Sequence, residues 1–145
     1  MFKEPPMATE FTNTQTDRAS ISAEGHVFEI SKAVTFEAAH KLPGRGKDDT
    51  YGRVHGHSFR LEATVSGKVQ PGKLWVEDIA VLTAALNEVA EALDHQMLND
   101  VPGLEVPTLE NIAVWAVTHL QGKLNGLSMV TVSRPSLNER CSVKV

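Results

Sequence analysis

The residues best suited to carry out chemistry are three histidines: His40, at the end of the segment FEAAH, and His55 and His57 in the segment VHGHS. In an extended strand, residues i and i+2 project from the same face, so His55 and His57 can reach one metal ion from one side. Three neutral imidazoles bind zinc and leave a fourth position open for water or a substrate oxygen. A single histidine is usually a hydrogen-bonded core or surface residue, but this spacing favours a catalytic zinc site on His40, His55 and His57.

The composition predicts an ordinary globular protein without nucleic-acid or membrane partners. The chain has 145 residues, of which 41% are hydrophobic and 22% are charged. Its net charge of −4 and lack of a basic run argue against binding to nucleic acid. No apolar stretch is long enough to span a bilayer, and the first residues lack the apolar core of a secretion signal. Because the single cysteine, Cys141, cannot form an internal disulfide, we expect a cytoplasmic protein.

Alternating apolar residues predict four β-strands. The predicted strands cover residues 27–36, 58–66, 129–132 and 141–145. Residues 41–54, between the first two strands, are dense in glycine, proline and aspartate and are expected to form a polar loop that ends at the histidine pair. The first 25 residues have almost no apolar periodicity, so we expect a flexible extension over residues 1–25 and a single domain over residues 26–145.

Three- and four-residue apolar spacing predicts two amphipathic helices in the middle of the chain. The first runs from its cap at about Asp78 to Leu93. The second begins at Thr108, whose hydroxyl can accept from exposed backbone amides, and carries Glu110 in its positive first turn. It is expected to reach about Leu124 and to be ended by Gly126.

This order of elements predicts an α+β fold, a four-stranded antiparallel sheet with two helices on one face. Such a small sheet has two open edges and one uncovered face, so we expect a symmetric homo-oligomer formed through the sheet.

At this level of detail the chain resembles the 6-pyruvoyltetrahydropterin synthase and 6-carboxytetrahydropterin synthase family, from about Val34 to the end. The segments that carry the resemblance are FEAAHKLP (36–43), GRVHGHSF (52–59), WVED (75–78), LDHQMLNDVPGLE (93–105) and PTLEN (107–111). Residues 93–105 are most similar to the bacterial carboxy branch, which makes 7-deazaguanine precursors such as those of queuosine. The resemblance implies the tunnelling fold, with ββααββ order, assembled as a trimer or hexamer with active sites between subunits. It also implies Zn²⁺ on the three histidines.

The resemblance further implies a pterin-like small-molecule substrate, which in the family is dihydroneopterin triphosphate. Zinc binds oxygens of the three-carbon side chain and acidifies the neighbouring C–H bonds, so that nearby bases can move protons. Asp94 and His95 match an Asp-His couple in which the carboxylate fixes the imidazole tautomer, which suits a general acid/base. Without the resemblance, the two residues would simply end the first helix. Thr108 and Glu110 lie in a matched segment and are candidate substrate-binding residues.

The chain departs from the family pattern at two positions. Four residues before the first histidine of the HGH pair, where the family has a catalytic cysteine, stands Tyr51. Tyr51 is either a substitute acid/base, assisted by a nearby cation, or an aromatic lining of the site. Arg134 stands where the family has a pterin-anchoring glutamate; it has only donors and prefers a carboxylate or phosphate. Glu139 is either a replacement anchor for the substrate or an exposed charge paired with Arg140.

These features predict a zinc-dependent lyase-like enzyme that acts on the side chain of a pterin or a related bicyclic heterocycle. The changes at Tyr51 and Arg134 imply an altered reaction, whereas the histidines and the Asp94-His95 couple imply that zinc chemistry is still used. One alternative is a diverged homologue that binds a pterin-like or purine-like ligand without turnover of dihydroneopterin triphosphate. A further alternative is a non-enzymatic oligomer with structural zinc.

Overall fold

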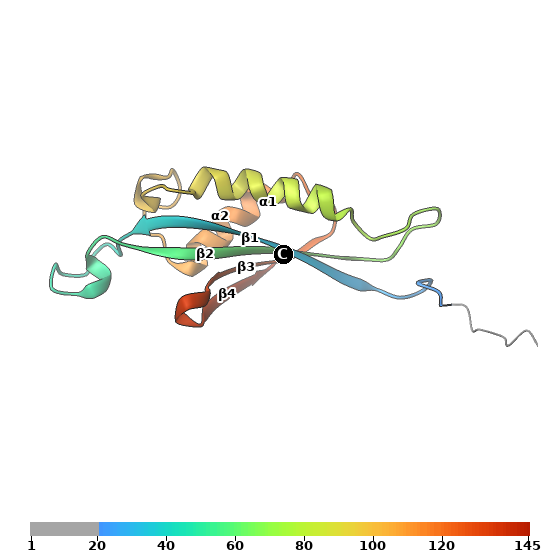
Figure 1. The fold of residues 1–145 in the computed structure, drawn as a ribbon, viewed down its shortest axis with the longest axis horizontal. Helices are drawn as coiled ribbons and strands as arrows, with labels where there is room; N and C mark the ends of the chain where they lie inside the picture. Colours follow the sequence, from blue (N-terminus) through green and yellow to red (C-terminus); the bar gives the residue numbers. More distant parts are fainter. Residues whose placement is uncertain (1–20) are drawn as a thin grey trace, which may run out of the picture.

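Two helices cover one side of a four-stranded antiparallel sheet in the computed structural model, which describes residues 21–145 (Figure 1). The elements are β1 (Phe28–His40), β2 (His55–Gly67), α1 (Ile79–Leu93), α2 (Leu109–Leu120), β3 (Leu127–Arg134) and β4 (Glu139–Lys144). The strand order in the sheet is β1-β2-β3-β4. The predicted α+β fold and its ββααββ order are confirmed. Most of the predicted extension over residues 1–25 lies outside the described residues and stays a prediction.

β1 and β2 form the long hairpin that carries the candidate metal ligands. They pair along their whole length, and the register places His40 opposite His55 and Ala38 opposite His57. Both strands extend past their alternating apolar residues, because their backbones stay paired at this end, where the side chains are small or imidazole. The three histidines therefore lie in the regular ladder, where the backbone fixes their direction.

The helices and the sheet enclose the hydrophobic core. Both helices begin at the predicted cap residues, because the Asp78 side chain accepts from the Ala80 amide at 2.8 Å and the Thr108 side chain accepts from the Asn111 amide at 3.3 Å. The core side chains without solvent exposure include Phe59, Leu61, Leu82, Leu86, Leu93, Leu98, Leu104, Ile112, Leu120, Val130 and Val132. Residues near the C-terminal ends of β1 and α1 thus share one core with the segment that precedes α2.

The predicted end of the second helix is wrong. α2 ends at Leu120, whose carbonyl accepts from the amides of both Lys123 and Leu124 and so closes a turn. Gly126 instead leads the chain into β3 with a φ of +73°, and its carbonyl accepts from the Ser66 amide at 2.9 Å. A Cβ atom there would lie 2.7 Å from the Ser66 carbonyl oxygen, so glycine is required by this close approach rather than as a helix stop.

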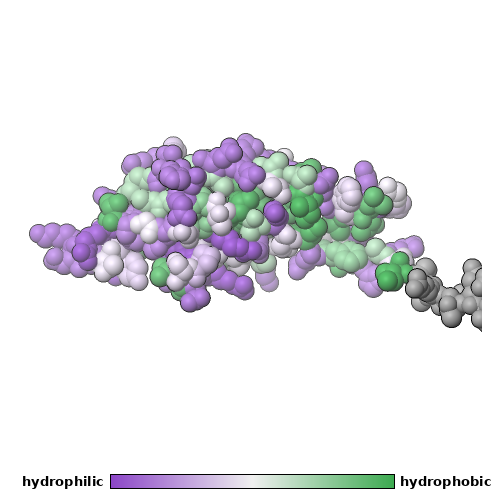
Figure 2. Space-filling model, in the orientation of Figure 1, coloured by the Kyte–Doolittle hydropathy of each residue, from purple (hydrophilic) through white to green (hydrophobic). Residues whose placement is uncertain are grey.

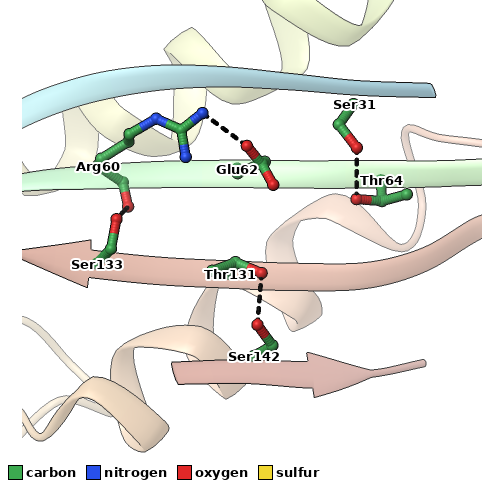
Figure 3. A network of polar contacts seen from close by, with 7 residues as sticks. All are labelled: Ser31, Arg60, Glu62, Thr64, Thr131, Ser133 and Ser142. Carbon is green, nitrogen blue, oxygen red and sulfur yellow. Dashed lines mark hydrogen bonds and ion pairs between the residues drawn. The ribbon is translucent and has the colours of Figure 1, made fainter. Parts of the chain in front are cut away.

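The face of the sheet opposite the helices is polar (Figure 3). Side-chain contacts on this face include Ser31–Thr64 at 2.8 Å, Thr131–Ser142 at 2.7 Å and Arg60–Glu62 at 2.6 Å. Hydroxyl pairs of this kind link neighbouring strands without requiring an apolar cover. No helix within residues 21–145 covers this face, as the sequence predicted, and assembly through the sheet stays a prediction.

The two ends of the sheet carry different loops (Figure 1). The loop of residues 41–54 lies at the end that holds the histidines, and Figure 2 shows hydrophilic side chains there. The loop of residues 68–77 lies at the opposite end, beside the start of β1. None of the helices in the described part of the chain has the length and apolar character needed to cross a membrane.

Candidate metal centre

The three predicted histidines converge where β1 ends and β2 begins. One ring nitrogen from each lies within 4.8 Å of those of the other two. The ring centroids are 4.6 Å apart for His40–His55, 5.1 Å for His40–His57 and 4.9 Å for His55–His57. Within residues 21–145, no cysteine or carboxylate joins this group. The arrangement therefore offers three imidazole ligands and leaves a further position for a small molecule.

Backbone carbonyls orient two of these imidazoles. Nδ1 of His40 lies 2.9 Å from the Pro107 carbonyl oxygen, and Nδ1 of His55 lies 2.8 Å from the Arg53 carbonyl oxygen. Because a carbonyl oxygen only accepts, Nδ1 carries the proton in both rings and Nε2 keeps its lone pair. Both Nε2 atoms are buried and have no hydrogen-bond partner. Buried polar atoms of this kind require a partner, and a metal ion fits the two lone pairs.

Burial favours the neutral form of two of the three candidate ligands, His57 and His40. It lowers the pKa of His57 to about 4, and the positive charge of Arg134 acts in the same direction. Burial also lowers the pKa of His40, against the opposing effect of its hydrogen bond to Pro107. A metal ion binds only the neutral imidazole, so these rings need not lose a proton near pH 7 before they bind one.

Two phenylalanines form the floor of the site. Phe59 is fully buried and stacks on Phe36 with ring centroids 5.1 Å apart and an interplanar angle of 10°. The rings of His40 and His57 meet Phe59 edge-on, at centroid distances of 5.8 Å and 5.7 Å. This packing fixes the orientation of both imidazoles and keeps water from reaching them through the core.

A pocket of about 300 Å³ opens beside His40 and brings several of the predicted site residues together. Its lining residues are His40, Leu42, Arg45, Tyr51, Thr108, Leu109, Glu110 and Arg134. A larger cavity of about 430 Å³ lies at the other end of the sheet around Ser66, Trp75 and Gly126, but contains no group of metal-ligating side chains. The smaller pocket is the better candidate for chemistry because it adjoins the histidines.

Tyr51 lies in a 3₁₀ turn (Thr50–Gly52) of the polar loop. Its ring centroid is 6.2 Å from that of His55, and the Arg45 guanidinium lies 5.3 Å from its ring centroid. A Cβ atom on Gly52 would lie 2.5 Å from the Gly46 carbonyl oxygen, so only glycine lets the loop pack this closely beneath Tyr51. Tyr51 thus lines the pocket with a cation beside it, and its role as an acid or base stays a prediction.

Arg134 and Glu139 lie opposite each other in the β3–β4 register. The Arg134 Nη2 atom is 2.5 Å from Glu139 Oε2, and its Nη1 atom is 3.3 Å from His57 Nε2. Glu139 therefore pairs with Arg134 and not with Arg140, which is paired with Ser133 in the ladder and so points to the other face. Arg134 lines the pocket, whereas Glu139 does not. Arg134 is thus paired with a carboxylate of the protein, and direct contact of either residue with substrate stays a prediction.

The Asp94-His95 couple lies at the end of α1, against the outer edge of β1. Asp94 Oδ2 is 2.9 Å from His95 Nδ1, and Asp94 Oδ1 accepts from the Glu37 amide at 2.8 Å. The hydrogen bond from Glu37, followed by the one from His95, lowers the pKa of Asp94 and keeps it ionised. His95 has a φ of +56° and a side chain that is 80% exposed. The couple is formed as predicted, but it does not line the pocket beside His40.

Two contributors to the site were missed in the sequence. The Pro107 carbonyl orients His40, and a backbone carbonyl has no signature in side-chain types. Arg45 lines the pocket and pairs with Asp49 at 2.6 Å. The i, i+4 spacing of these opposite charges was a usable signal, although it occurs here in a loop and not in a helix.

Comparison with known proteins identifies the family of this chain. Residues 29–144 match the sequence model of a family described as 6-pyruvoyl tetrahydropterin synthase. The chain belongs to this family. The resemblance drawn from the sequence motifs is confirmed, and with it the tunnelling fold.

Relatives within the family carry several names. The putative 6-carboxy-5,6,7,8-tetrahydropterin synthase of Archaeoglobus fulgidus is 39% identical over 94 residues, which cover 65% of this chain and 76% of that protein. The 6-carboxy-5,6,7,8-tetrahydropterin synthase of Synechocystis is 42% identical over 97 residues, covering 63% and 74%. The dihydroneopterin monophosphate aldolase of Pyrococcus furiosus is 35% identical over 92 residues, also covering 63% and 74%. The names of these relatives all refer to pterins, as tetrahydropterin synthases or as a dihydroneopterin monophosphate aldolase.

A solved structure agrees with the fold. The 6-pyruvoyl tetrahydropterin synthase of Caenorhabditis elegans superposes with a TM-score of 0.72 and 25% identity, over 83% of this chain and 96% of that chain.

Proposed function

We propose that this protein is a zinc-dependent lyase that acts on the side chain of a pterin or a closely related bicyclic heterocycle. The observation that carries the proposal is the convergence of three imidazoles, with two buried Nε2 lone pairs left free, beside a pocket of about 300 Å³. Bound zinc supplies Lewis acidity toward side-chain oxygens of the substrate. The names of the relatives support a substrate with a pterin ring and an oxygenated side chain.

The residues of the chain have separate tasks in this proposal. His40, His55 and His57 hold the ion, and Phe59 fixes the orientation of two of the three rings. Asp94 holds the Nδ1 proton of His95, so the exposed Nε2 of His95 is free to accept a proton and return it. Tyr51, Thr108, Glu110 and Arg134 line the pocket and position the substrate, with Tyr51 as a candidate proton donor.

The active form in this proposal is a homo-oligomer, a trimer or hexamer. His95 is 80% exposed on the outer edge of β1, and the polar face of the sheet has no cover within residues 21–145. Proton transfer is efficient where water is excluded, so an exposed acid/base couple favours a site completed by a neighbouring subunit. Dilution to the monomer is then expected to abolish turnover.

A second candidate is a diverged homologue that binds a pterin-like or purine-like ligand without turning it over. It is favoured by the pocket lining, which contains no thiol and places the guanidinium of Arg134 next to the histidines. Cys141, the one cysteine of the chain, lies in β4 and is not among the lining residues.

Incubation of the zinc-loaded protein with dihydroneopterin triphosphate, and separately with dihydroneopterin monophosphate, distinguishes the two candidates. The enzyme is expected to eliminate the phosphate group from the side chain or to remove side-chain carbons, seen as a change in the pterin absorption spectrum and in product mass. His55→Ala is expected to lose both zinc and activity. The matched variant His26→Ala, at an exposed histidine just before the opposite end of β1 from His40, is expected to keep both. Tight binding by calorimetry with no spectral change would support the binder, and full zinc retention by His55→Ala would overturn the metal site.

Substitution of the unusual tyrosine tests how far the site has diverged. If the pocket otherwise retains the family chemistry, Tyr51→Cys introduces a thiol next to the histidines and raises activity on dihydroneopterin triphosphate. Unchanged activity in a variant that still binds zinc would show that the pocket differs beyond this residue.

A further inference from the structure

Arg134 lines the pocket and also contacts His57, one of the candidate metal ligands. Its side chain is 14% exposed and projects from the end of β3 on the face that the helices cover. Nη1 lies 3.3 Å from His57 Nε2, and Nη2 is held by Glu139 at 2.5 Å. Its Nε atom is buried and has no hydrogen-bond partner. One guanidinium thus contacts a ring nitrogen of a candidate ligand and also carries an unused donor.

The contact between Arg134 and His57 competes with metal binding. The lone pair on Nε2 of His57 can either accept a hydrogen bond from Nη1 or bind a metal ion, but not both. The guanidinium cannot relieve this competition by losing its proton, because it stays charged at every accessible pH. It also repels a divalent cation at this short distance. Arg134 therefore lowers metal affinity unless another group neutralises its charge and accepts its hydrogen bonds.

The pocket has features that favour binding of an anion, which could neutralise Arg134 and accept its hydrogen bonds. Glu139 pairs only with Nη2, so Nη1 and Nε become free donors once His57 binds a metal. The guanidinium of Arg45 lines the same pocket, as do the first residues of α2 at its positive N-terminal end, beginning at the cap Thr108. Glu110 is the one carboxylate among the lining residues. Guanidinium donors prefer carboxylate and phosphate oxygens.

We propose that Arg134 couples two binding events in this pocket, so that a divalent metal ion and an anionic ligand group, a carboxylate or a phosphate, bind cooperatively. The anion neutralises the guanidinium and draws its donors away from His57, and the metal in turn frees those donors for the anion. By linkage, each partner raises the affinity of the other by the same factor. This inference rests on the metal site of the proposed function but not on the pterin reaction.

Zinc affinity measured by competition with a chromophoric chelator tests the coupling without any activity assay. The variants are Arg134→Gln, which removes the charge, and Arg134→Lys, which keeps it. The matched control is Arg140→Gln, which removes the same charge from the opposite face of the sheet. Each protein is titrated alone, with acetate and with inorganic phosphate, so that the two arms separate carboxylate from phosphate recognition.

The expected results differ between the variants. Without an added anion, Arg134→Gln binds zinc about tenfold more tightly than the wild type, while Arg140→Gln and Arg134→Lys remain close to the wild type. Acetate or phosphate raises the zinc affinity of the wild type by about tenfold and leaves Arg134→Gln unchanged.

Three outcomes would overturn the inference, and they differ in what else they overturn. Equal zinc affinity of wild type and Arg134→Gln without anion would exclude the competition, and equal anion effects in both would exclude the coupling; the metal site survives in either case. If neither protein bound zinc while both remained folded by circular dichroism, the metal site of the proposed function would fail together with the inference.

Discussion

Without bound metal, the stability of the protein should fall as the pH falls through the range in which an ordinary histidine titrates. Burial and the charge of Arg134 lower the pKa of His57 to about 4, from an ordinary value of 6.5. Between these two values the unfolded chain binds a proton that the folded chain does not. The free energy of unfolding is therefore unaffected above about pH 6.5 and decreases from there toward about pH 4.

The size of this effect follows from the shift of the pKa. One proton changes the free energy of unfolding by at most about 1.4 kcal/mol per pH unit. For His57 the loss between about pH 7.5 and about pH 5 has a ceiling of about 2 kcal/mol. Because this side chain is only partly buried and water screens it, we expect about 1 kcal/mol. The pKa of His40 is lowered as well, so it adds a loss of the same sign.

Urea unfolding of the chelator-treated protein at several pH values between about 7.5 and about 5 measures this loss. His57→Gln cannot titrate and is expected to lose about 1 kcal/mol less than the wild type over this range. His26→Gln, at an exposed position, serves as the control and should follow the wild type. Identical pH dependence of the wild type and His57→Gln would refute the conclusion that the folded site keeps this imidazole neutral.

Other substitutions test the parts that support the site. Phe59→Leu should lower the free energy of unfolding by about 1–2 kcal/mol and weaken zinc binding, because the rings of His40 and His57 pack edge-on against Phe59. The control Phe28→Leu, at a 38% exposed position, should change neither. Unchanged zinc affinity in Phe59→Leu would contradict the conclusion that Phe59 orients these rings. Thr108→Ala should cost about 1 kcal/mol through the loss of the α2 cap, and a cost near zero would show that the 3.3 Å bond contributes little. Asp94→Asn should keep its zinc but lose most of its turnover, because the carboxylate that holds the Nδ1 proton of His95 is gone. Loss of zinc instead would place Asp94 in the metal site and not beside His95.

The sequence predicted the order of the elements because apolar periodicity reports directly on which face of each element is buried. It also predicted that the histidines converge, since the i, i+2 spacing of His55 and His57 fixes a common face in any extended strand. The ends of the helices and strands were harder to predict from the sequence. β1 continues to His40 because its backbone pairs with β2, and α2 stops at Leu120 because two amides close a turn on its carbonyl. Neither cause is visible in hydrophobic spacing.

The surroundings of the candidate metal ligands depend on contacts between segments far apart in the sequence. Arg134 reaches His57 and Glu139 because the 3₁₀ turn (Pro135–Leu137) sets the β3–β4 register, in which Asn138 adopts a left-handed conformation with φ +55°. His40 meets the Pro107 carbonyl across 67 positions of the sequence. The sequence identified His40, His57, Arg134 and Glu139 as candidates, but which groups they meet follows only from the folded backbone.

The central claim is a zinc ion held by three imidazoles with one position open, and X-ray absorption spectroscopy of the zinc-loaded protein tests it most directly. We expect one zinc per chain, with three nitrogen neighbours at about 2.0–2.1 Å and one oxygen neighbour from a small molecule. We also expect that alanine at His40, His55 or His57 removes the signal in each case. Four ligands from protein side chains, or a spectrum unchanged by any one of the three substitutions, would contradict this claim.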